Sequence, residues 1–480
     1  MNHKMILPAE KPSDIMPSAN CPTADTRAAD LKGTVSVRIK DLFPEITQGY
    51  LQNEGVSEIR KATETALSNI QMDGIHQNHT VNILCSEHGF YLLGGKHYCE
   101  MLKAIKEIVQ QRTGCSKIRL RVAAGMGSRE SDEVIRHFRL TETFGKRVRS
   151  MNAFDKGIPI ETEIGTLYGL AGAYDADWVI HAFHDEPRDL YFYRLIDRAI
   201  KAFAMSYARF ETRSVYHGNF GNRSGAFIQR AIFDSPFVQK KFAFGCFLRM
   251  TPAGITGVDA DNDLYRLGKN MTVDLLRDYG KILQLFSKIE SCVAILDGGR
   301  YAYYLHAGGI VFGALENAEY DAFDLSKPAA LAYYDLLGKL SRGETEAMDN
   351  IMFVNPGLKA VVINQAWPGI PMSDLPMFIP TIVVGEKQAD MWRRDAANPS
   401  LMDLSQQSET LEEAVALAEQ LAGTDKILVF DGSFGYINLS ASLAEELLRK
   451  APEVNQVVNE ELLPLWLRQR GIDPDMANRG

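Results

Sequence analysis

The stretch from Lys201 to His217 contains two residue types that can hold a cofactor. Their spacing of sixteen residues raises the question of whether the lysine holds something that the histidine touches. The same residues have an ordinary interpretation, because most helical lysines are solvated and a histidine before GNFGNRSG can simply precede a turn. The residue types alone leave both interpretations open.

A histidine cluster follows a predicted strand in VIHAFHDEPRD. His181 lies inside the strand, and His184 lies at its carboxyl end beside Asp185 and Glu186. Ligands of open α/β sheets bind at the carboxyl ends of strands, and a histidine next to carboxylates can act as an acid, a base or a metal ligand. A polar surface loop would have the same composition.

A glycine pair follows another predicted strand in VAAGMGSRESDEV. Gly125 and Gly127 form the turn, and Ser128 and Arg129 begin the next helix. Backbone amides at the start of a helix can bind an anion such as a phosphate. Because the third glycine of the dinucleotide-binding fingerprint is missing, a tight turn is the simpler interpretation.

The composition describes an acidic globular chain. Its 480 residues carry a formal net charge of -9, and 46% of them are hydrophobic. This length predicts more than one domain, and the acidic balance argues against nucleic-acid binding. No run approaches about eighteen apolar residues, so we expect no membrane span. We expect a cytoplasmic protein, because an apolar signal segment is absent and the six cysteines are scattered without CxxC pairs.

Short apolar runs alternate with helical patterns through most of the chain. Eight runs predict buried strands: 80–85, 117–123, 177–183, 242–250, 291–296, 359–364, 380–385 and 425–430. Such alternation is typical of parallel sheets that helices cover on both faces. The predicted fold is therefore α/β, with two α/β domains, mostly parallel sheets flanked by helices, and an active-site cleft between the domains. We assign residues 1–32 to a flexible N-terminal tail, 33–270 to the first domain and 271–480 to the second.

Two helical patterns give specific expectations. Thr410 and Glu413 form a capping box at the start of one helix, and Gly423 ends it. A helix over residues 190–210 is also predicted, with Lys201 at the edge of an apolar face. That face consists of Ile200, Phe203, Tyr207 and Phe210.

Several blocks of the sequence, in the same order, resemble the nickel-pincer lactate racemase family. They extend over about residues 33 to 440. The blocks are VSEIRKATETALSNIQMDGI, VNILCSEHGFYL, IRLRVAAGMGSRESDEVI, IETEIGTLYGLAGAYDADWVIHAFHDEPRD, GVDADNDLYRLGKNM, AILDGGRYAYYLHAGGIVFGALENAEYDAF and the segment 408–432. The order of the blocks carries the resemblance more than any single motif does.

In that family a lysine carries a nicotinate-derived pincer cofactor that holds nickel, and a histidine completes the coordination. The resemblance implies that Lys201 is the tether and that His217 binds nickel. It implies an isomerase, a racemase or epimerase that moves a hydride from the Cα of a 2-hydroxy acid to the cofactor and back to the opposite face. Two acid/base groups would handle the hydroxyl proton. The implied partners are this small-molecule substrate and the enzymes that synthesise the cofactor.

The chain differs from the family pattern at several of the family's site positions. The first loop reads Glu87-His88-Gly89-Phe90 where the family has Asp-x-x-Arg, two family histidines fall on Ser128 and Arg188, and the nearest matches to the family's substrate-binding glutamine and lysine are Gln284 and Lys288. His184 or His181 could replace the histidine that is lost at Arg188. Two alternatives therefore stay open. One is a nickel-free relative that uses Glu87, Arg129 and His184 for proton transfer on an acidic substrate, and the other is a non-catalytic homolog that binds a small molecule.

We expect the polar residues that follow the predicted strands to share one wall of the cleft. These are Glu87, Ser128, His184 and His217, with Gly125 and Gly127 beside them. We also expect the cleft to be locally positive, because guanidinium and ammonium groups bind carboxylates and phosphates. The residues expected to supply this charge are Arg129, Arg188 and Lys288.

Overall fold

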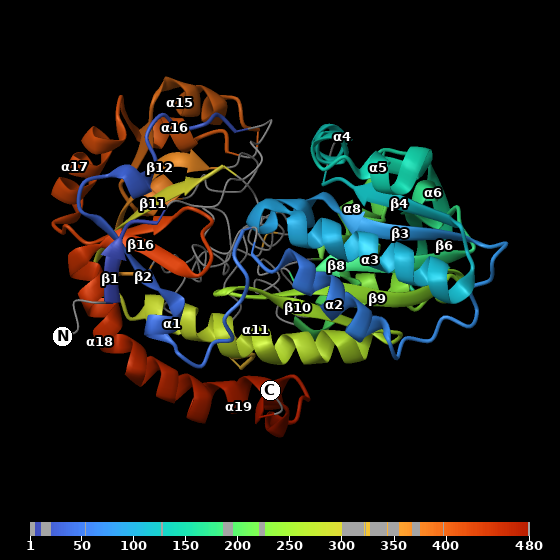
Figure 1. Ribbon diagram of the computed structural model, residues 1–480. Coiled ribbons are helices and arrows are strands. Elements are labelled where there is room, and N and C mark those ends of the chain that lie inside the picture. Colours follow the sequence, from blue (N-terminus) through green and yellow to red (C-terminus); the bar gives the residue numbers. More distant parts are fainter. Residues whose placement is uncertain are drawn as a thin grey trace.

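Two sheets, each flanked by helices, form the framework of the protein (Figure 1). The computed structural model describes residues 5–10, 21–52, 54–125, 128–185, 195–219, 226–299, 321, 323–326, 343, 355–366, 375–396 and 398–478. The fold class is the predicted one, α/β with mostly parallel sheets.

The first sheet has six strands in the order β10-β9-β8-β3-β4-β5. Five of them are parallel, and β10 runs antiparallel to β9. The strands are β3 (Thr80–Ser86), β4 (Lys117–Ala123), β5 (Val148–Met151), β8 (Trp178–His184), β9 (Phe242–Thr251) and β10 (Gly254–Asp261). The central strands β3 and β8 are buried along nearly their whole length, as continuous apolar runs in a covered parallel sheet should be. A separate hairpin consists of β6 (Gly157–Thr162) and β7 (Gly165–Leu170).

The second sheet has eight strands in the order β1-β2-β16-β15-β11-β12-β13-β14. The five strands from β15 to β14 in this order are parallel, and β16 runs antiparallel to both of its neighbours. The strands are β1 (Ile6–Pro8), β2 (Thr34–Arg38), β11 (Cys292–Gly298), β12 (Leu358–Ala366), β13 (Thr381–Val384), β14 (Gln406–Ser408), β15 (Ile427–Phe430) and β16 (Tyr436–Ser440).

Helices flank both sheets. Those in the first part of the chain are α1 (Ile39–Leu42), α2 (Val56–Leu67), α3 (Lys96–Thr113), α4 (Ser128–His137), α5 (Leu140–Phe144), α6 (Ala171–Tyr174), α7 (Lys201–Ala204), α8 (Phe210–Gly218), α9 (Ala226–Phe233) and α10 (Pro236–Gln239). Those in the second part are α11 (Leu264–Ser287), α14 (Leu375–Phe378), α15 (Glu386–Arg393), α16 (Leu401–Leu404), α17 (Leu411–Ala422), α18 (Ala441–Val457) and α19 (Leu463–Gln469).

The long helix α11 connects the two sheets. Figure 1 shows it along the bottom of the view, beneath both of them. It packs on β9 and β10, and near its end Phe286 contacts Phe430 of β15. The predicted boundary between residues 270 and 271 falls inside this helix.

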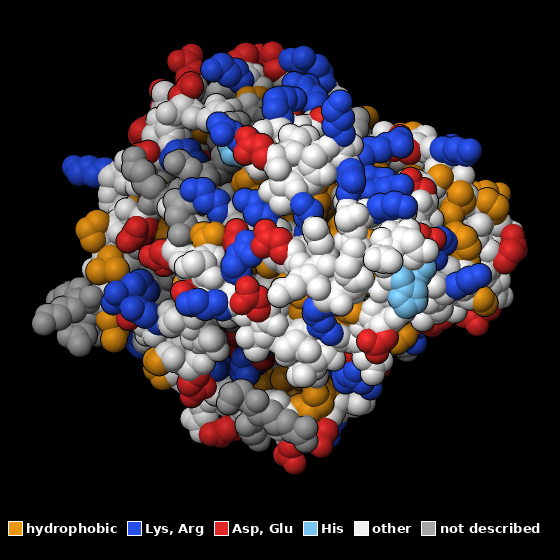
Figure 2. All heavy atoms as spheres, turned by 45° about the vertical axis from the view of Figure 1, so that its right-hand side comes forward, with side chains coloured by type: hydrophobic (Ala, Val, Ile, Leu, Met, Phe, Trp, Pro, Cys, Tyr) orange, Lys and Arg blue, Asp and Glu red, His pale blue; other side chains and the backbone are white. Residues whose placement is uncertain are grey.

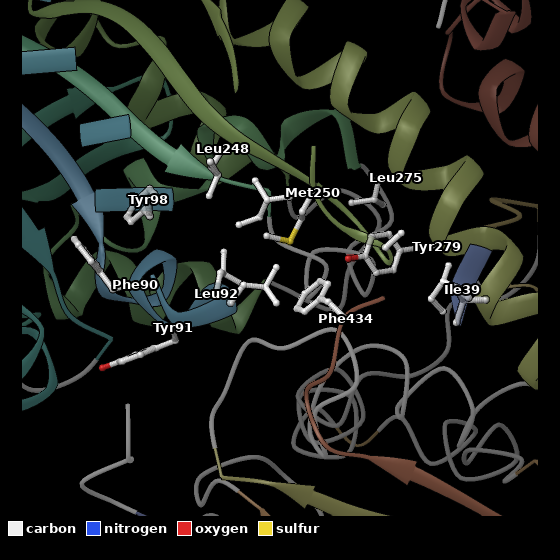
Figure 3. Packing of buried hydrophobic residues seen from close by; sticks show 14 of the residues in the cluster. Ile39, Phe90, Tyr91, Leu92, Tyr98, Leu248, Met250, Leu275, Tyr279 and Phe434 are labelled. Atoms are coloured by element: carbon white, nitrogen blue, oxygen red, sulfur yellow. The ribbon is translucent and has the colours of Figure 1, made fainter. Parts of the chain in front are cut away.

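One hydrophobic cluster extends from the first sheet to the second. Figure 3 shows part of it, with Met250 of β9, Tyr279 of α11 and Phe434 beyond β15. Each of these side chains is at most 3% exposed. Burial of a large apolar side chain contributes roughly 1.5–3 kcal/mol, so this shared core fixes how the sheets sit relative to each other.

The eight predicted strands are all present, as β3, β4, β8, β9, β11, β12, β13 and β15. The predicted capping box is also confirmed. The Thr410 hydroxyl accepts a hydrogen bond from the Glu413 amide, the Glu413 carboxylate accepts one from the Thr410 amide, and Gly423 ends α17 with a positive φ of 64°.

The predicted helix over residues 190–210 is wrong over 195–210, the part that the structure describes, because α7 ends at Ala204 and α8 begins at Phe210. The residues between pair with β7 instead. The Leu170 amide donates to Tyr207 O at 2.8 Å, and the Arg209 amide donates to Tyr168 O at 2.9 Å. Main-chain groups that bond to β7 cannot also form the hydrogen bonds of a continuous helix. Phe210, assigned to the buried face, is 41% exposed.

The described part of the N-terminal segment differs from the predicted flexible tail. Residues Ile6–Pro8 form β1, which pairs with β2, and β2 pairs with β16. Ala28 is fully buried, and its amide donates to Asp297 Oδ2 at 2.8 Å. The start of the chain therefore belongs to the second sheet, which composition alone could not indicate.

Candidate active site

Glu87 follows β3, and its buried carboxylate faces the turn after β4. Its Oε1 accepts a hydrogen bond from the Gly125 amide at 2.7 Å, and its Oε2 accepts one from the Ser131 hydroxyl at 2.7 Å. Because β3 and β4 are neighbouring parallel strands, their carboxyl ends meet at this point. The structure thus brings together Glu87, Gly125 and the first turn of α4 at the edge where open α/β sheets bind ligands.

Burial raises the pKa of Glu87 to about 7. The hydrogen bonds from Ser131 and Gly125 oppose this rise, the charge of Glu130 adds to it, and the charge of Arg213 opposes it. A carboxyl group with a pKa near neutrality can both give and take a proton at physiological pH. Glu87 therefore has the properties of a general acid/base.

Arg213 is a buried residue of α8 that the sequence did not single out. Its guanidinium donates to main-chain oxygens: Nε to Ala208 O at 2.9 Å, Nη2 to Ser206 O at 3.3 Å, and Nη1 to Ala124 O at 3.2 Å and to Gly125 O. Burial lowers the pKa of Arg213 to about 10, so it stays charged at neutral pH. In the sequence, an arginine between Thr212 and Ser214 looks like a solvated helix residue, and only its position one turn before His217 could have drawn notice.

His217 lies in the last turn of α8, not in the loop that its neighbours suggested. Its Nδ1 donates to Arg213 O at 2.7 Å, so the lone pair is on Nε2. Burial lowers the pKa of His217, the hydrogen bond opposes this, and the charges of Lys201 and Arg213 lower it further. Lys201 is the first residue of α7, and α7 packs against α8, the helix that carries His217.

The two histidines of β8 have different environments. His181 is a core residue: the Tyr207 hydroxyl donates to its Nδ1 at 2.7 Å, and its Nε2 donates to Ala199 O at 3.0 Å. Burial lowers the pKa of His181 to about 3, so it stays neutral. His184 ends the strand beside β3, and its Nδ1 donates to Asp185 O at 2.8 Å. Of the two, His184 is the one at the carboxyl edge.

Two residues predicted to supply positive charge are exposed, and the structure gives them other partners. Arg129 is exposed and pairs along α4 with Glu133, at 3.6 Å. Lys288 is exposed after α11, and its carbonyl oxygen accepts from Lys450 Nζ at 2.6 Å. Because Lys288 precedes β11, it lies at the amino edge of the second sheet. Ser128 is the first residue of α4, whereas Gly127 and Arg188 lie outside the described residues.

The carboxyl edge of the second sheet also buries acidic residues, Asp297 of β11 and Asp431 after β15. Asp297 Oδ2 accepts from Arg27 Nε at 2.9 Å, and Asp297 Oδ1 accepts from Asn364 Nδ2 at 2.8 Å. Burial raises the pKa of both carboxyl groups, and the charge of Arg27 opposes the rise. The N-terminal segment thus supplies the counter-charge at this edge.

Two further searches concern metals and membranes. Within the described ranges, no group of three or more His, Cys, Asp or Glu side chains is placed to hold a metal ion. Across that same part of the chain, no helix is both long and apolar enough to cross a membrane. Figure 2 shows acidic and basic side chains intermingled on one face of the molecule.

Comparison with known proteins gives several solved chains of partly similar shape. No family model matches the sequence, and no curated protein matches it. The lactate racemase apoprotein from Thermoanaerobacterium thermosaccharolyticum aligns with a TM-score of 0.46 and 13% identity, covering 86% of this chain and 98% of that one. Similarity at this level assigns neither a family nor a function.

Proposed function

We propose that the protein is a racemase or epimerase of a 2-hydroxy acid, with its active site at the carboxyl edge of the first sheet. The observation that supports this most is that α7, which begins with Lys201, packs against α8, which carries His217. The two residues are on separate helices, α7 and α8, so sequence spacing alone does not make them neighbours. His217 is linked to Glu87, whose pKa suits proton transfer, through hydrogen bonds of Arg213 and Gly125.

The residues present suit a lysine-tethered pincer cofactor and its nickel. A metal-binding imidazole must be neutral, and its second ring nitrogen commonly donates to a carbonyl oxygen. His217 meets both conditions. Lys201 would hold the cofactor through an amide-type bond, which would remove the ammonium charge that now lowers the pKa of His217. One imidazole is a single ligand, so the remaining donors would come from the cofactor.

When bound, such a cofactor supplies an acceptor for the hydride on the substrate Cα. The residues of the chain would bind the substrate and handle its hydroxyl proton. The charge of Arg213 favours an anionic substrate at this edge, because a buried charge is weakly screened. Glu87 would accept the hydroxyl proton in one half of the reaction and return it in the other. His184, at the end of the next strand, is the second candidate for proton transfer.

A second candidate function is proton transfer at the Cα of an acidic substrate, without nickel. The pKa of about 7 at Glu87, close to the buried charge of Arg213, favours this alternative. A base of this strength could remove an acidic Cα proton while the arginine attracts the substrate carboxylate.

Isomerisation in D2O separates the two candidates. Hydride transfer returns the original Cα hydrogen, whereas proton abstraction exchanges it with solvent. Protein produced together with the cofactor-synthesising enzymes would be incubated with single enantiomers of 2-hydroxy acids, and the Cα position read by proton NMR. We expect isomerised product that retains protium, and no product from Lys201→Ala.

The matched control is Lys61→Ala, because Lys61 is an exposed helical lysine that pairs with Glu58 at 3.2 Å. This variant should keep full activity. Product with deuterium at Cα would favour the second candidate, and the absence of any isomerised 2-hydroxy acid would contradict the first.

A further inference from the structure

Arg213 contacts both the turn that binds Glu87 and the imidazole of His217. We propose that Arg213 is a positioning residue, whose side chain fixes the turn that binds Glu87 and whose main-chain oxygen orients the ring of His217. This inference rests on the proposed function in taking Glu87 and His217 as the reacting groups. The contacts of Arg213 on which it is built are all between residues of this chain.

The guanidinium of Arg213 holds the turn after β4 from its carbonyl side. Nη1 donates to Ala124 O at 3.2 Å and to Gly125 O. The same Gly125 donates its amide to Glu87 Oε1 at 2.7 Å. One peptide turn is thus held by Arg213 through its oxygens and by Glu87 through its nitrogen. The fit is close, because a Cβ on Gly125 would lie 3.4 Å from Glu87 Oε1.

The main-chain carbonyl of Arg213 holds the imidazole of His217. His217 Nδ1 donates to Arg213 O at 2.7 Å, across one turn of α8. This contact selects the tautomer with the lone pair on Nε2 and limits rotation of the ring. The Arg213 side chain is bonded to the turn after β4, and the Arg213 carbonyl oxygen is bonded to the imidazole of His217. A shift of Arg213 would therefore displace Glu87 and His217 together.

The charges around Glu87 support this assignment. His88 Nε2 lies 3.8 Å from Oε1, Ser131 donates to Oε2, and Glu130 acts at longer range. Arg213 adds a positive charge that opposes the effect of burial on the pKa of Glu87. A purely structural arginine would stabilise the fold without influencing the ionisation of this carboxyl group.

The test is Arg213→Gln, with the ionisation of Glu87 followed by carbon NMR of glutamate labelled at its carboxyl carbon. The Glu87 signal would be identified as the one missing in Glu87→Gln. We expect the pKa of Glu87 to rise, because the charge of Arg213 opposes the effect of burial on this carboxyl group. The pH profile of isomerisation should move in the same direction by a similar amount.

The matched control is Arg470→Gln. Arg470 is also buried and donates to main-chain oxygens, those of Phe323 and Trp466, both at 2.9 Å, and burial likewise lowers its pKa to about 10. We expect Arg470→Gln to lower stability and to leave the pKa of Glu87 unchanged.

A second variant, Arg213→Lys, keeps the charge but loses the planar guanidinium and two of its five donors. We expect a smaller pKa change at Glu87 and about tenfold faster hydrogen exchange of the Gly125 amide, the equivalent of one lost hydrogen bond. An unchanged pKa in a folded Arg213→Gln protein would overturn the proposal. If Arg213→Gln does not fold, unchanged exchange at Gly125 in Arg213→Lys would overturn it. Neither readout uses activity, so a wild-type protein without isomerase activity would remove the proposed reaction and leave this coupling standing.

Discussion

The two sheets bury carboxyl groups at the same kind of place, the carboxyl ends of parallel strands, but they compensate the charge differently. At the second sheet, Arg27 Nε lies 2.9 Å from Asp297 Oδ2 in a direct ion pair, and the Ala28 amide donates to the same oxygen. At the first sheet, Glu87 accepts hydrogen bonds from an amide and a hydroxyl, while the guanidinium of Arg213 donates to carbonyl oxygens.

This difference separates a structural edge from a chemical one. The N-terminal segment lies against the second edge: the Ala24 amide donates to Gln365 Oε1 at 2.9 Å, and Asn364 Nδ2 donates to Thr26 O at 2.8 Å. The first edge instead combines an ionisable carboxyl group with the neutral imidazole of α8, a helix that packs against α7. A covered ion pair stabilises a fold, whereas a carboxyl group with a pKa near 7 can exchange protons with a substrate.

The largest expected effect comes from breaking the ion pair of the second edge. Arg27→Ala leaves Asp297 buried without its cation, and breaking a buried pair typically costs 3–5 kcal/mol. Because the Arg27 side chain is 33% exposed, we expect a loss of about 3 kcal/mol in the free energy of unfolding, measured by urea denaturation. Activity at the first edge should persist in the folded protein. Arg38→Ala removes a local, more exposed pair with Asp41 and should cost less than about 1 kcal/mol. Equal losses in the two variants would contradict the comparison.

The next largest expected effect is a gain in the free energy of unfolding rather than a loss. Glu87 titrates at about 7 in the folded protein but at about 4.3 when unfolded, so the unfolded state releases its proton first as the pH rises. The wild type therefore loses stability between these two values. Glu87→Gln has no carboxyl group to titrate at this position, so it does not lose this stability as the pH rises. It should be more stable than the wild type by about 2 kcal/mol at pH 8, with no such advantage near pH 4. It should also be inactive. Urea denaturation across this pH range is the measurement, and the exposed Glu64→Gln on α2 is the control. A destabilised Glu87→Gln at pH 8 would show that the carboxylate is structural.

Much of the framework could be predicted, because strands of covered parallel sheets are continuous apolar runs. The eight strands that form such runs were found, whereas short or partly exposed ones such as β5, β7 and β16 leave no comparable pattern. The break before α8 depends on pairing with β7, which is distant in sequence. Nor could the partners of Arg213 or Arg27 be predicted, since only the folded chain brings them near.

A smaller effect is expected at Ser131, which donates to Glu87 Oε2. Ser131→Ala removes one hydrogen bond to the ionised carboxyl group, so the pKa of Glu87 should rise, and stability should fall by about 1 kcal/mol. Carbon NMR titration of Glu87 is the measurement. Ser214→Ala, which removes an exposed hydroxyl that donates to Phe210 O, should change neither quantity. If the two serine variants behaved alike, the Ser131 contact would have no part in tuning Glu87.

The smallest effect on stability is expected at Lys201. Alanine and lysine have similar helix propensities, so Lys201→Ala at the start of α7 should change the free energy of unfolding by less than about 0.5 kcal/mol. Its effect on chemistry should be complete, because the proposed covalent attachment needs the amine. His217→Ala should keep the attached group and lose the metal, since the histidine contributes only a coordination bond. A large loss of stability in Lys201→Ala would indicate a structural lysine.

The most direct test of the account is the intact mass of the full chain produced with the cofactor-synthesising enzymes, followed by peptide mapping. The account predicts a covalent adduct on the peptide that contains Lys201, absent in Lys201→Ala and present in His217→Ala. An adduct that survives Lys201→Ala, or a nickel-loaded wild type without any adduct, would contradict it.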